Sequence, residues 1–114
     1  MPSSFEAEFY SGDPLMIDYT PTGGAVAAGE VVAVGDALGV AHGNIANATL
    51  GALAWTNGVY KARSEQQIGP GKKVYWYDSA SQISSNSSRG NQIGYTVSNF
   101  TGANALGYFS LRQA

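Results

Sequence analysis

The chain of 114 residues contains no cysteine and a single histidine, His42. Without cysteine it has no disulfide, no thiolate metal ligand and no thiol nucleophile. One histidine is too few for nearly every zinc site, and it weakens any case for a Ser-His-Asp triad. These two shortages disfavour the commonest catalytic and metal-binding arrangements of small proteins.

Charged residues are scarce as well. Asp, Glu, Lys and Arg make up 12% of the chain, about half of the roughly 25% that is usual in globular domains. Eight acidic residues against six basic ones give a net charge of −2. A protein that binds a nucleic-acid backbone needs a basic excess to neutralise phosphates, so we expect no nucleic-acid partner.

Long apolar runs are missing too. The longest apolar tract lies around residues 25–34 and is interrupted by Gly29 and Glu30, far short of the ~20 residues that cross a bilayer. Residues 1–10 carry acidic side chains where a signal peptide has a basic stretch. We therefore expect a protein that has no membrane partner and is made in the cytoplasm.

The sequence is rich in short β-branched or aromatic runs, each ended by Gly, Asn, Asp or Pro. Such spacing is typical of all-β sandwiches and barrels. The runs predict strands at residues 5–9, 15–20, 30–34, 38–41, 49–56, 59–62, 72–78, 92–97 and 106–112. We expect an all-β fold, a small single-domain β-barrel or β-sandwich of short antiparallel strands with long loops. Residues 1–10 would be an N-terminal arm or edge strand, and residues 11–114 the single domain.

Two connections predict hairpins. Residues 11–14, Ser-Gly-Asp-Pro, supply turn residues between the first two runs. Asn57-Gly58 joins the fifth and sixth runs, and Asn-Gly is the strongest short hairpin signal. The alanine-rich residues 44–54 have helical propensity, but Gly51 and the β-branched residues there favour a strand.

Aromatic side chains point both ways in the run 72–78. Val74 and Trp76 share one face, and Tyr75 and Tyr77 share the other. With the adjacent lysines they are similar to a stacking platform for single-stranded nucleic acid, a reading that the acidic net charge disfavours. The serine-rich residues 79–91 read as an exposed loop that could include a short strand at Gln82–Ser84. Side chains expected together on one face are Ile93, Tyr95 and Val97, and, facing inward, Phe109 and Leu111.

Candidate catalytic groups are weak. His42 lies between Ala and Gly in an expected turn, where a loop histidine is commoner than a general base. Asp18, Asp36 and Asp78 sit within or at the ends of strands, where aspartate usually caps or turns the chain. Residues 69–73 are a turn, because they lack the spacing and the Ser or Thr of a phosphate loop. We expect no enzyme, no catalytic residue, no cofactor and no metal.

The composition instead indicates an interaction surface. A small domain with few charges and with aromatic residues on both faces of several strands cannot hide all its apolar area in one core. Depletion of charge and enrichment in aromatic residues characterise the centre of protein interfaces. We infer that the chain packs against copies of itself or against a large partner, which would also cover its edge strands.

An ordered set of short motifs resembles the DUF2190 family of phage capsid cement, or head decoration, proteins. The resemblance covers nearly the whole chain and departs at two turns, Gly71-Lys72 and residues 47–49. The motifs are Gly29-Glu-Val-Val-Ala-Val-Gly-Asp36, Leu38-Gly-Val-Ala41, Asn44-Ile-Ala46, Gly51-Ala-Leu-Ala-Trp-Thr-Asn-Gly-Val-Tyr60, Val74-Tyr-Trp-Tyr-Asp78 and Ile93-Gly-Tyr95.

This resemblance implies a structural virion protein that is made in the bacterial host cytoplasm and binds the outer surface of the assembled head. The implied partners are the major capsid protein and further copies of the chain, commonly in a homotrimer. We expect residues 2–10 to add a strand to the capsid or to lie on it. The candidate capsid or subunit interface residues, each of which could instead be an ordinary core residue, are Phe5, Phe9, Tyr10, Trp55, Tyr75 and Tyr77.

Two other functions fit the same composition. A glycan-binding β-sandwich would stack sugars on Trp55 or Tyr75. A tail or neck component of the virion would have the same shortage of charge and abundance of short strands.

Overall fold

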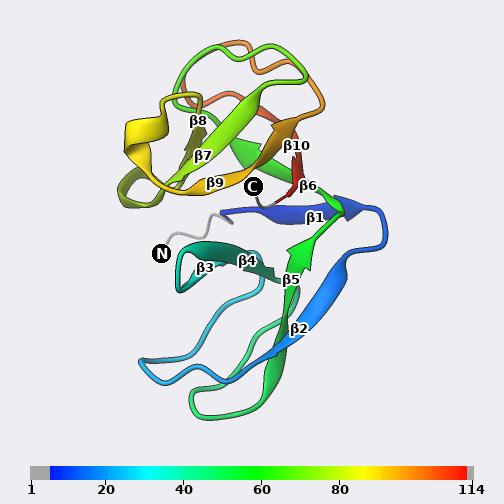
Figure 1. Cartoon of the computed structure of the whole chain (residues 1–114), viewed down its shortest axis with the longest axis vertical. Helices are drawn as coiled ribbons and strands as arrows, with labels where there is room; N and C mark the ends of the chain where they lie inside the picture. Colours follow the sequence, from blue (N-terminus) through cyan, green and yellow to red (C-terminus); the bar gives the residue numbers. More distant parts are fainter. Residues whose placement is uncertain (1–5, 113–114) are drawn as a thin grey trace.

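The computed structural model describes residues 6–112. Within them the chain forms two antiparallel sheets, which confirms the all-β expectation and gives a sandwich rather than a closed barrel (Figure 1). The strands are β1 (Glu8–Ser11), β2 (Leu15–Tyr19), β3 (Val31–Val34), β4 (Ala37–Ala41), β5 (Gly51–Thr56), β6 (Val59–Arg63), β7 (Lys73–Tyr77), β8 (Gln82–Ser84), β9 (Gln92–Thr96) and β10 (Leu106–Leu111).

The larger sheet has six strands in the order β1-β6-β10-β9-β7-β8, and the smaller has four in the order β2-β5-β4-β3. The six-stranded sheet lies in the upper half of Figure 1 and the four-stranded sheet in the lower half. The larger sheet is strongly curled, because Glu65 N donates to the carbonyl oxygen of Ile83 at 2.8 Å and so draws the end of β6 toward β8.

The main core fills the space between the two sheets. Tyr60, Phe109 and Trp76 enter it from the six-stranded sheet, and Val40 and Ala54 enter it from the four-stranded sheet. A second, smaller cluster lies on the other face of the four-stranded sheet and comprises Val26, Val32, Ala41, Ile45 and Leu53. The smaller sheet is therefore covered on both faces around Val31, Val32 and Val40, as apolar residues at alternate and at intervening positions of residues 30–34 predict.

Neither predicted hairpin forms. β1 pairs with β6 and β2 pairs with β5, so the chain passes from one sheet to the other at both predicted turns. Gly12 and Gly58 lie at this crossing with φ of +101° and +84°, and a Cβ on Gly12 would stand 3.0 Å from the Gly58 Cα. The glycines thus serve a close approach of two backbones rather than tight turns.

Two further local expectations can be compared with the structure. The short strand that the serine-rich residues 79–91 could include forms as β8, where Ile83 is fully buried. The rest is not simply an exposed loop, because two short 3-10 turns, η1 (Asp78–Ala80) and η2 (Ser87–Arg89), flank β8. Residues 51–56 form a strand, as Gly51 and its neighbours predicted, and not a helix.

The expectation that Ile93, Tyr95 and Val97 share one face is wrong. The β7–β9 pairing shifts so that Val74 faces Gly94 while Tyr75 faces Gln92. Ile93 is the extra residue of the resulting β-bulge, which turns its side chain into the core. Tyr95 beyond the bulge faces outward instead.

Candidate protein interface

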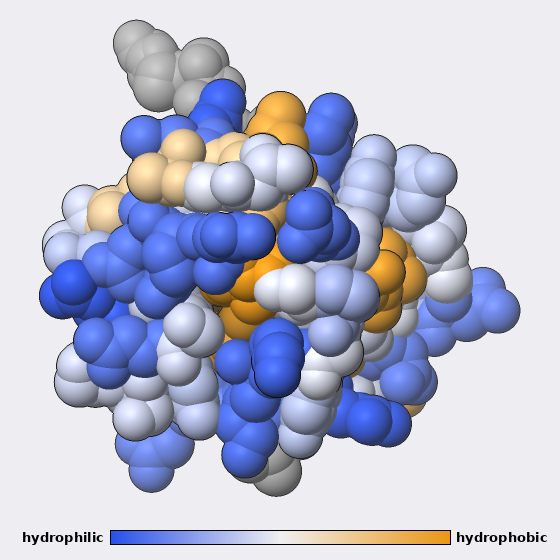
Figure 2. Space-filling model, turned by 90° about the horizontal axis from the view of Figure 1, so that it is seen from above, coloured by the Kyte–Doolittle hydropathy of each residue, from blue (hydrophilic) through white to orange (hydrophobic). Residues whose placement is uncertain are grey.

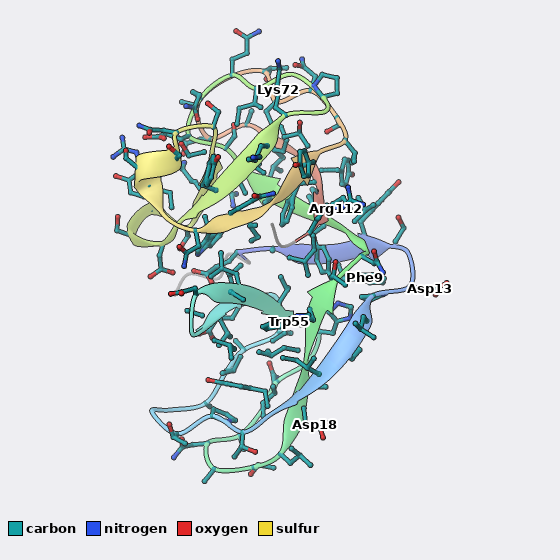
Figure 3. The ribbon with its side chains drawn as sticks, viewed as in Figure 1. Phe9, Asp13, Asp18, Trp55, Lys72 and Arg112 are labelled. Carbon is teal, nitrogen blue, oxygen red and sulfur yellow. The ribbon has the colours of Figure 1, made fainter. Side chains whose placement is uncertain are left out.

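The predicted interface residues lie in three places rather than in one cluster. Phe5 is outside the described residues. Phe9 and Tyr10 on β1 are 41% and 61% exposed, and Trp55 on β5 is half-buried near the crossing of the two sheets (Figure 3). Tyr75 and Tyr77 are half-buried on β7, at the other side of the six-stranded sheet.

Tyr10 and Trp55 both sit at β-bulges. Phe9 pairs with Tyr60 while Ser11 pairs with Val59, so Tyr10 is the extra residue of β1. In the same way Leu15 pairs with Thr56 while Met16 pairs with Ala54, so Trp55 is the extra residue of β5. A bulge re-aims one side chain out of the regular alternation, so the crossing of the sheets directs both aromatic residues.

Tyrosines follow the outer face of the six-stranded sheet from strand to strand. The rings of Tyr108 and Tyr10 lie against each other, with centroids 4.4 Å apart. Ser110 is two residues after Tyr108 and therefore on the same face of β10, and it pairs with Tyr95 of β9. Tyr95 in turn pairs with Lys73, at the start of β7. We call this row the tyrosine face, and its members are Tyr10, Tyr75, Tyr77, Tyr95 and Tyr108.

Cations accompany these rings. The Arg89 guanidinium stands 4.4 Å from the Tyr77 ring centroid, and that of Arg112 stands 5.9 Å from Tyr95. Arg89 also binds Glu65 at 2.6 Å. Hydrogen bonds from Arg89 and Ser84 hold the pKa of the Glu65 carboxyl below its usual value. The face therefore combines flat aromatic rings with positive charge, the residue types enriched at binding hot spots.

Sequence reasoning missed Tyr95 and Tyr108. The position of Tyr108 could have been predicted from the sequence. Phe109 and Leu111 are fully buried as predicted, and the alternation of side chains along a strand then places Tyr108 on the outer face. Tyr95 was harder to place, because the bulge at Ile93 reverses its face and the one local signal of that bulge is the isolated Gly94 within the strand.

His42 is not part of this face. Its Nε2 lies 2.6 Å from the hydroxyl of Tyr60, and the Phe9 ring covers it with a centroid distance of 4.5 Å. Partial burial lowers the pKa of His42 below its ordinary value of 6.5, and burial raises the pKa of the Tyr60 hydroxyl. The histidine is thus a neutral hydrogen-bonding partner of a core tyrosine. Phe9 serves at least partly to cover that pair.

The His42 environment predicts a pH dependence of stability. The folded protein disfavours protonated His42, so the contribution of this residue to the free energy of unfolding is fully present above pH 6.5. Below that value the unfolded chain takes up a proton at His42, and the stability falls. Thermal melts between about pH 7 and pH 5 should show a decreasing Tm for the wild type and a flatter profile for His42→Gln. Protonation of Glu65 lowers stability only below its ordinary pKa of 4.5, so it does not account for a change in Tm between pH 7 and pH 5. A His42→Gln variant whose Tm falls with pH as steeply as that of the wild type would contradict the assignment to His42.

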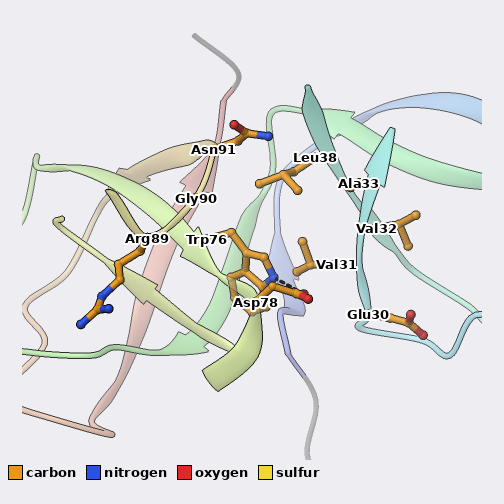
Figure 4. A pocket seen from close by; sticks show the side chains of 10 residues that line it. All are labelled: Glu30, Val31, Val32, Ala33, Leu38, Trp76, Asp78, Arg89, Gly90 and Asn91. Carbon is orange, nitrogen blue, oxygen red and sulfur yellow. Dashed lines mark hydrogen bonds between the residues drawn. The ribbon is translucent and has the colours of Figure 1, made fainter. Parts of the chain in front are cut away.

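A groove of about 430 Å³ lies beside β3, the last strand of the four-stranded sheet (Figure 4). Trp76 forms its floor and donates from Nε1 to Asp78 Oδ1 at 3.1 Å. Glu6 Oε1 accepts a hydrogen bond from Val31 N at 2.9 Å, so the start of the described chain reaches this edge. Among residues 6–112, β3 pairs only with β4, and it contains no Lys or Pro of the kind that commonly protects an edge strand.

Neither a metal centre nor a membrane-spanning helix is found where the structure can be described. Within residues 6–112, no three His, Asp or Glu side chains gather as metal ligands would. No helical segment of that part is long and apolar enough to span a membrane.

The sequence profile of the phage cement proteins matches residues 11–111. The chain belongs to the phage cement protein family. It is therefore a structural, capsid-associated phage protein, a class that is not enzymatic. No curated protein and no solved structure matched the chain significantly. The matched range begins at the last residue of β1, so most of that strand and everything before it lie outside the family's shared region.

Proposed function

We propose that this cement protein binds the outer surface of the assembled head and reinforces it against the pressure of packaged DNA. The partner is the major capsid protein, and the working unit is a homo-oligomer, a trimer in the simplest case. An oligomer that touches several capsid subunits makes its later contacts at high effective concentration, so weak individual contacts add up to firm attachment.

The observation that carries this proposal, beside the family, is the tyrosine face. These side chains lie outside both clusters of buried apolar residues and are at least partly accessible to a partner. Tyr side chains offer large, rigid contact area at low entropic cost, and nearby Arg side chains add directional hydrogen bonds. Figure 2, a view onto the six-stranded end, shows a largely hydrophilic surface with apolar residues at its centre, at its upper edge and on its right side.

Mixing the purified protein with expanded, undecorated heads tests the proposal. We expect saturable binding and heads that withstand higher temperature before releasing DNA. A protein that leaves such heads bare under all conditions would refute the function. Electron microscopy of labelled virions separates head decoration from a tail or neck location, and a glycan array without hits dismisses the sugar-binding alternative.

The N-terminal residues form a separate contact in this proposal. Residues 2–10 would add a strand to the capsid or lie on it, but deleting all of them removes part of β1 and the fully buried Ala7. Deleting residues 2–5 alone leaves these in place. We expect the shortened protein to keep its Tm and to occupy fewer sites on undecorated heads. Unchanged occupancy would remove the N-terminal segment from the proposed contact.

A further inference from the structure

Charge is segregated between the two sheets. Residues 12–58, which contain the whole four-stranded sheet, carry four acidic side chains and neither Lys nor Arg. All six Lys and Arg residues follow at residues 61–112, within or beside the six-stranded sheet, where Glu6, Glu8, Glu65 and Asp78 reduce the net charge to +2. Figure 3 shows Lys72 at one end of the long axis and Asp18 toward the other. The four-stranded sheet is therefore the acidic end of the molecule, and the six-stranded sheet is the more basic end.

The acidic end also exposes apolar side chains. Val40 and Ala54 lie on the face of the four-stranded sheet that packs on the larger sheet. Met16 pairs with Ala54, and Asp18 pairs with Ala52, so these residues lie on the same face. Here β2 and β5 extend beyond the larger sheet, and Met16 is 40% exposed. Leu50, which directly precedes β5, is 66% exposed. We call Met16, Asp18, Leu50 and Ala52 the β2 patch.

We infer that the tyrosine face of one protomer packs against the β2 patch of the next. The inference rests on the proposed self-association and specifies the two surfaces that carry it. Tyrosine rings can cover Met16 and Leu50, while cations of the tyrosine face, Lys73 foremost, meet Asp18. Each surface supplies what the other lacks: one has aromatic rings and positive charge, the other aliphatic side chains and negative charge.

A contact of each surface with itself is disfavoured. Two tyrosine faces brought together would oppose their cations, and two β2 patches would oppose their carboxylates, which costs binding energy. Because the two complementary surfaces differ, the contact is head to tail. Such contacts close into a ring when the rotation between neighbours allows it, and a trimer is one such ring.

Charge-reversal variants test this contact between protomers in the purified protein, in the absence of phage heads. Asp18 and Lys73 are both exposed, so Asp18→Lys and Lys73→Glu leave the core intact. Sedimentation equilibrium should show each single variant dissociating at about tenfold or higher concentration than the wild type. The double variant carries the charges in exchanged positions and should recover most of the association. Asp36→Lys makes the same charge change in the exposed β3–β4 turn and should associate like the wild type.

Salt gives a second measurement. Raising it from about 0.1 M to about 1 M shortens electrostatic screening from about 10 Å to about 3 Å, which should shift the wild type toward monomer. A wild type that is monomeric at low salt, or an oligomer that neither reversal weakens, overturns the inference. Binding of the same wild-type protein to undecorated heads is scored separately, so loss of the head-to-tail contact and loss of the proposed function are distinguishable.

Discussion

Replacing Gly94 with alanine is expected to prevent stable folding. Gly94 lies on β9 between Leu111 of β10 and Val74 of β7. A Cβ at this position would overlap the carbonyl oxygen of Ser110 and come within 2.9 Å of its carbonyl carbon. Backbone in the middle of a sheet cannot move aside as a flexible side chain can, so β9 and β10 would have to separate.

The expected loss for Gly94→Ala exceeds about 3 kcal/mol, the upper end of the usual cost of overpacking. Against a total stability of about 5–15 kcal/mol, circular dichroism should show an unfolded protein or a Tm lowered by more than about 12 °C. The matched control is Gly23→Ala, because a Cβ there meets no atom within 4 Å. A variant of Gly94 with wild-type Tm would show that β9 and β10 do not approach as described.

Phe109→Ala is the second change with a large expected effect. Phe109 is fully buried, and its ring lies 5.9 Å from that of Tyr60 in the core between the two sheets. Removing a buried phenyl ring costs the transfer free energy of the ring and leaves a cavity, together about 3–5 kcal/mol. Urea unfolding should report this loss as a lower midpoint with an unchanged slope.

Phe9→Ala is the control for this experiment, because Phe9 is 41% exposed at the sheet edge. It should cost roughly 1 kcal/mol, since only part of the ring is removed from water. Equal losses for the two phenylalanines would contradict the assignment of Phe109 to the core and of Phe9 to its margin.

Most strands could be predicted because their signals are local. The runs 72–78 and 106–112 combine β-branched or aromatic residues with a clear end, and they contain β7 (Lys73–Tyr77) and β10 (Leu106–Leu111). The burial of Phe109 and Leu111 followed from the alternation of side chains along an extended chain. The two-sided burial of Val31 and Val32 followed from apolar residues at both parities.

The pairing of strands could not be predicted in the same way. Asn57-Gly58 has the composition of a hairpin turn, yet the residues after it pair with β1 and β10 in the other sheet. Asn57 N donates to the carbonyl oxygen of Leu111 at 2.8 Å, a partner distant in sequence. Turn propensity reports the backbone angles at two residues, and those angles suit a crossing as well as a hairpin.

By itself the sequence determined that this protein has an all-β core, a sparsely charged aromatic surface and the character of a phage cement protein. Tertiary structure alone decided which aromatic residues share a surface. Tyr95 and Tyr108 joined Tyr10 on the outer face because a bulge and strand pairings distant in sequence placed them there. Composition is a property of the chain, whereas a surface depends on register, which is set only when distant strands meet.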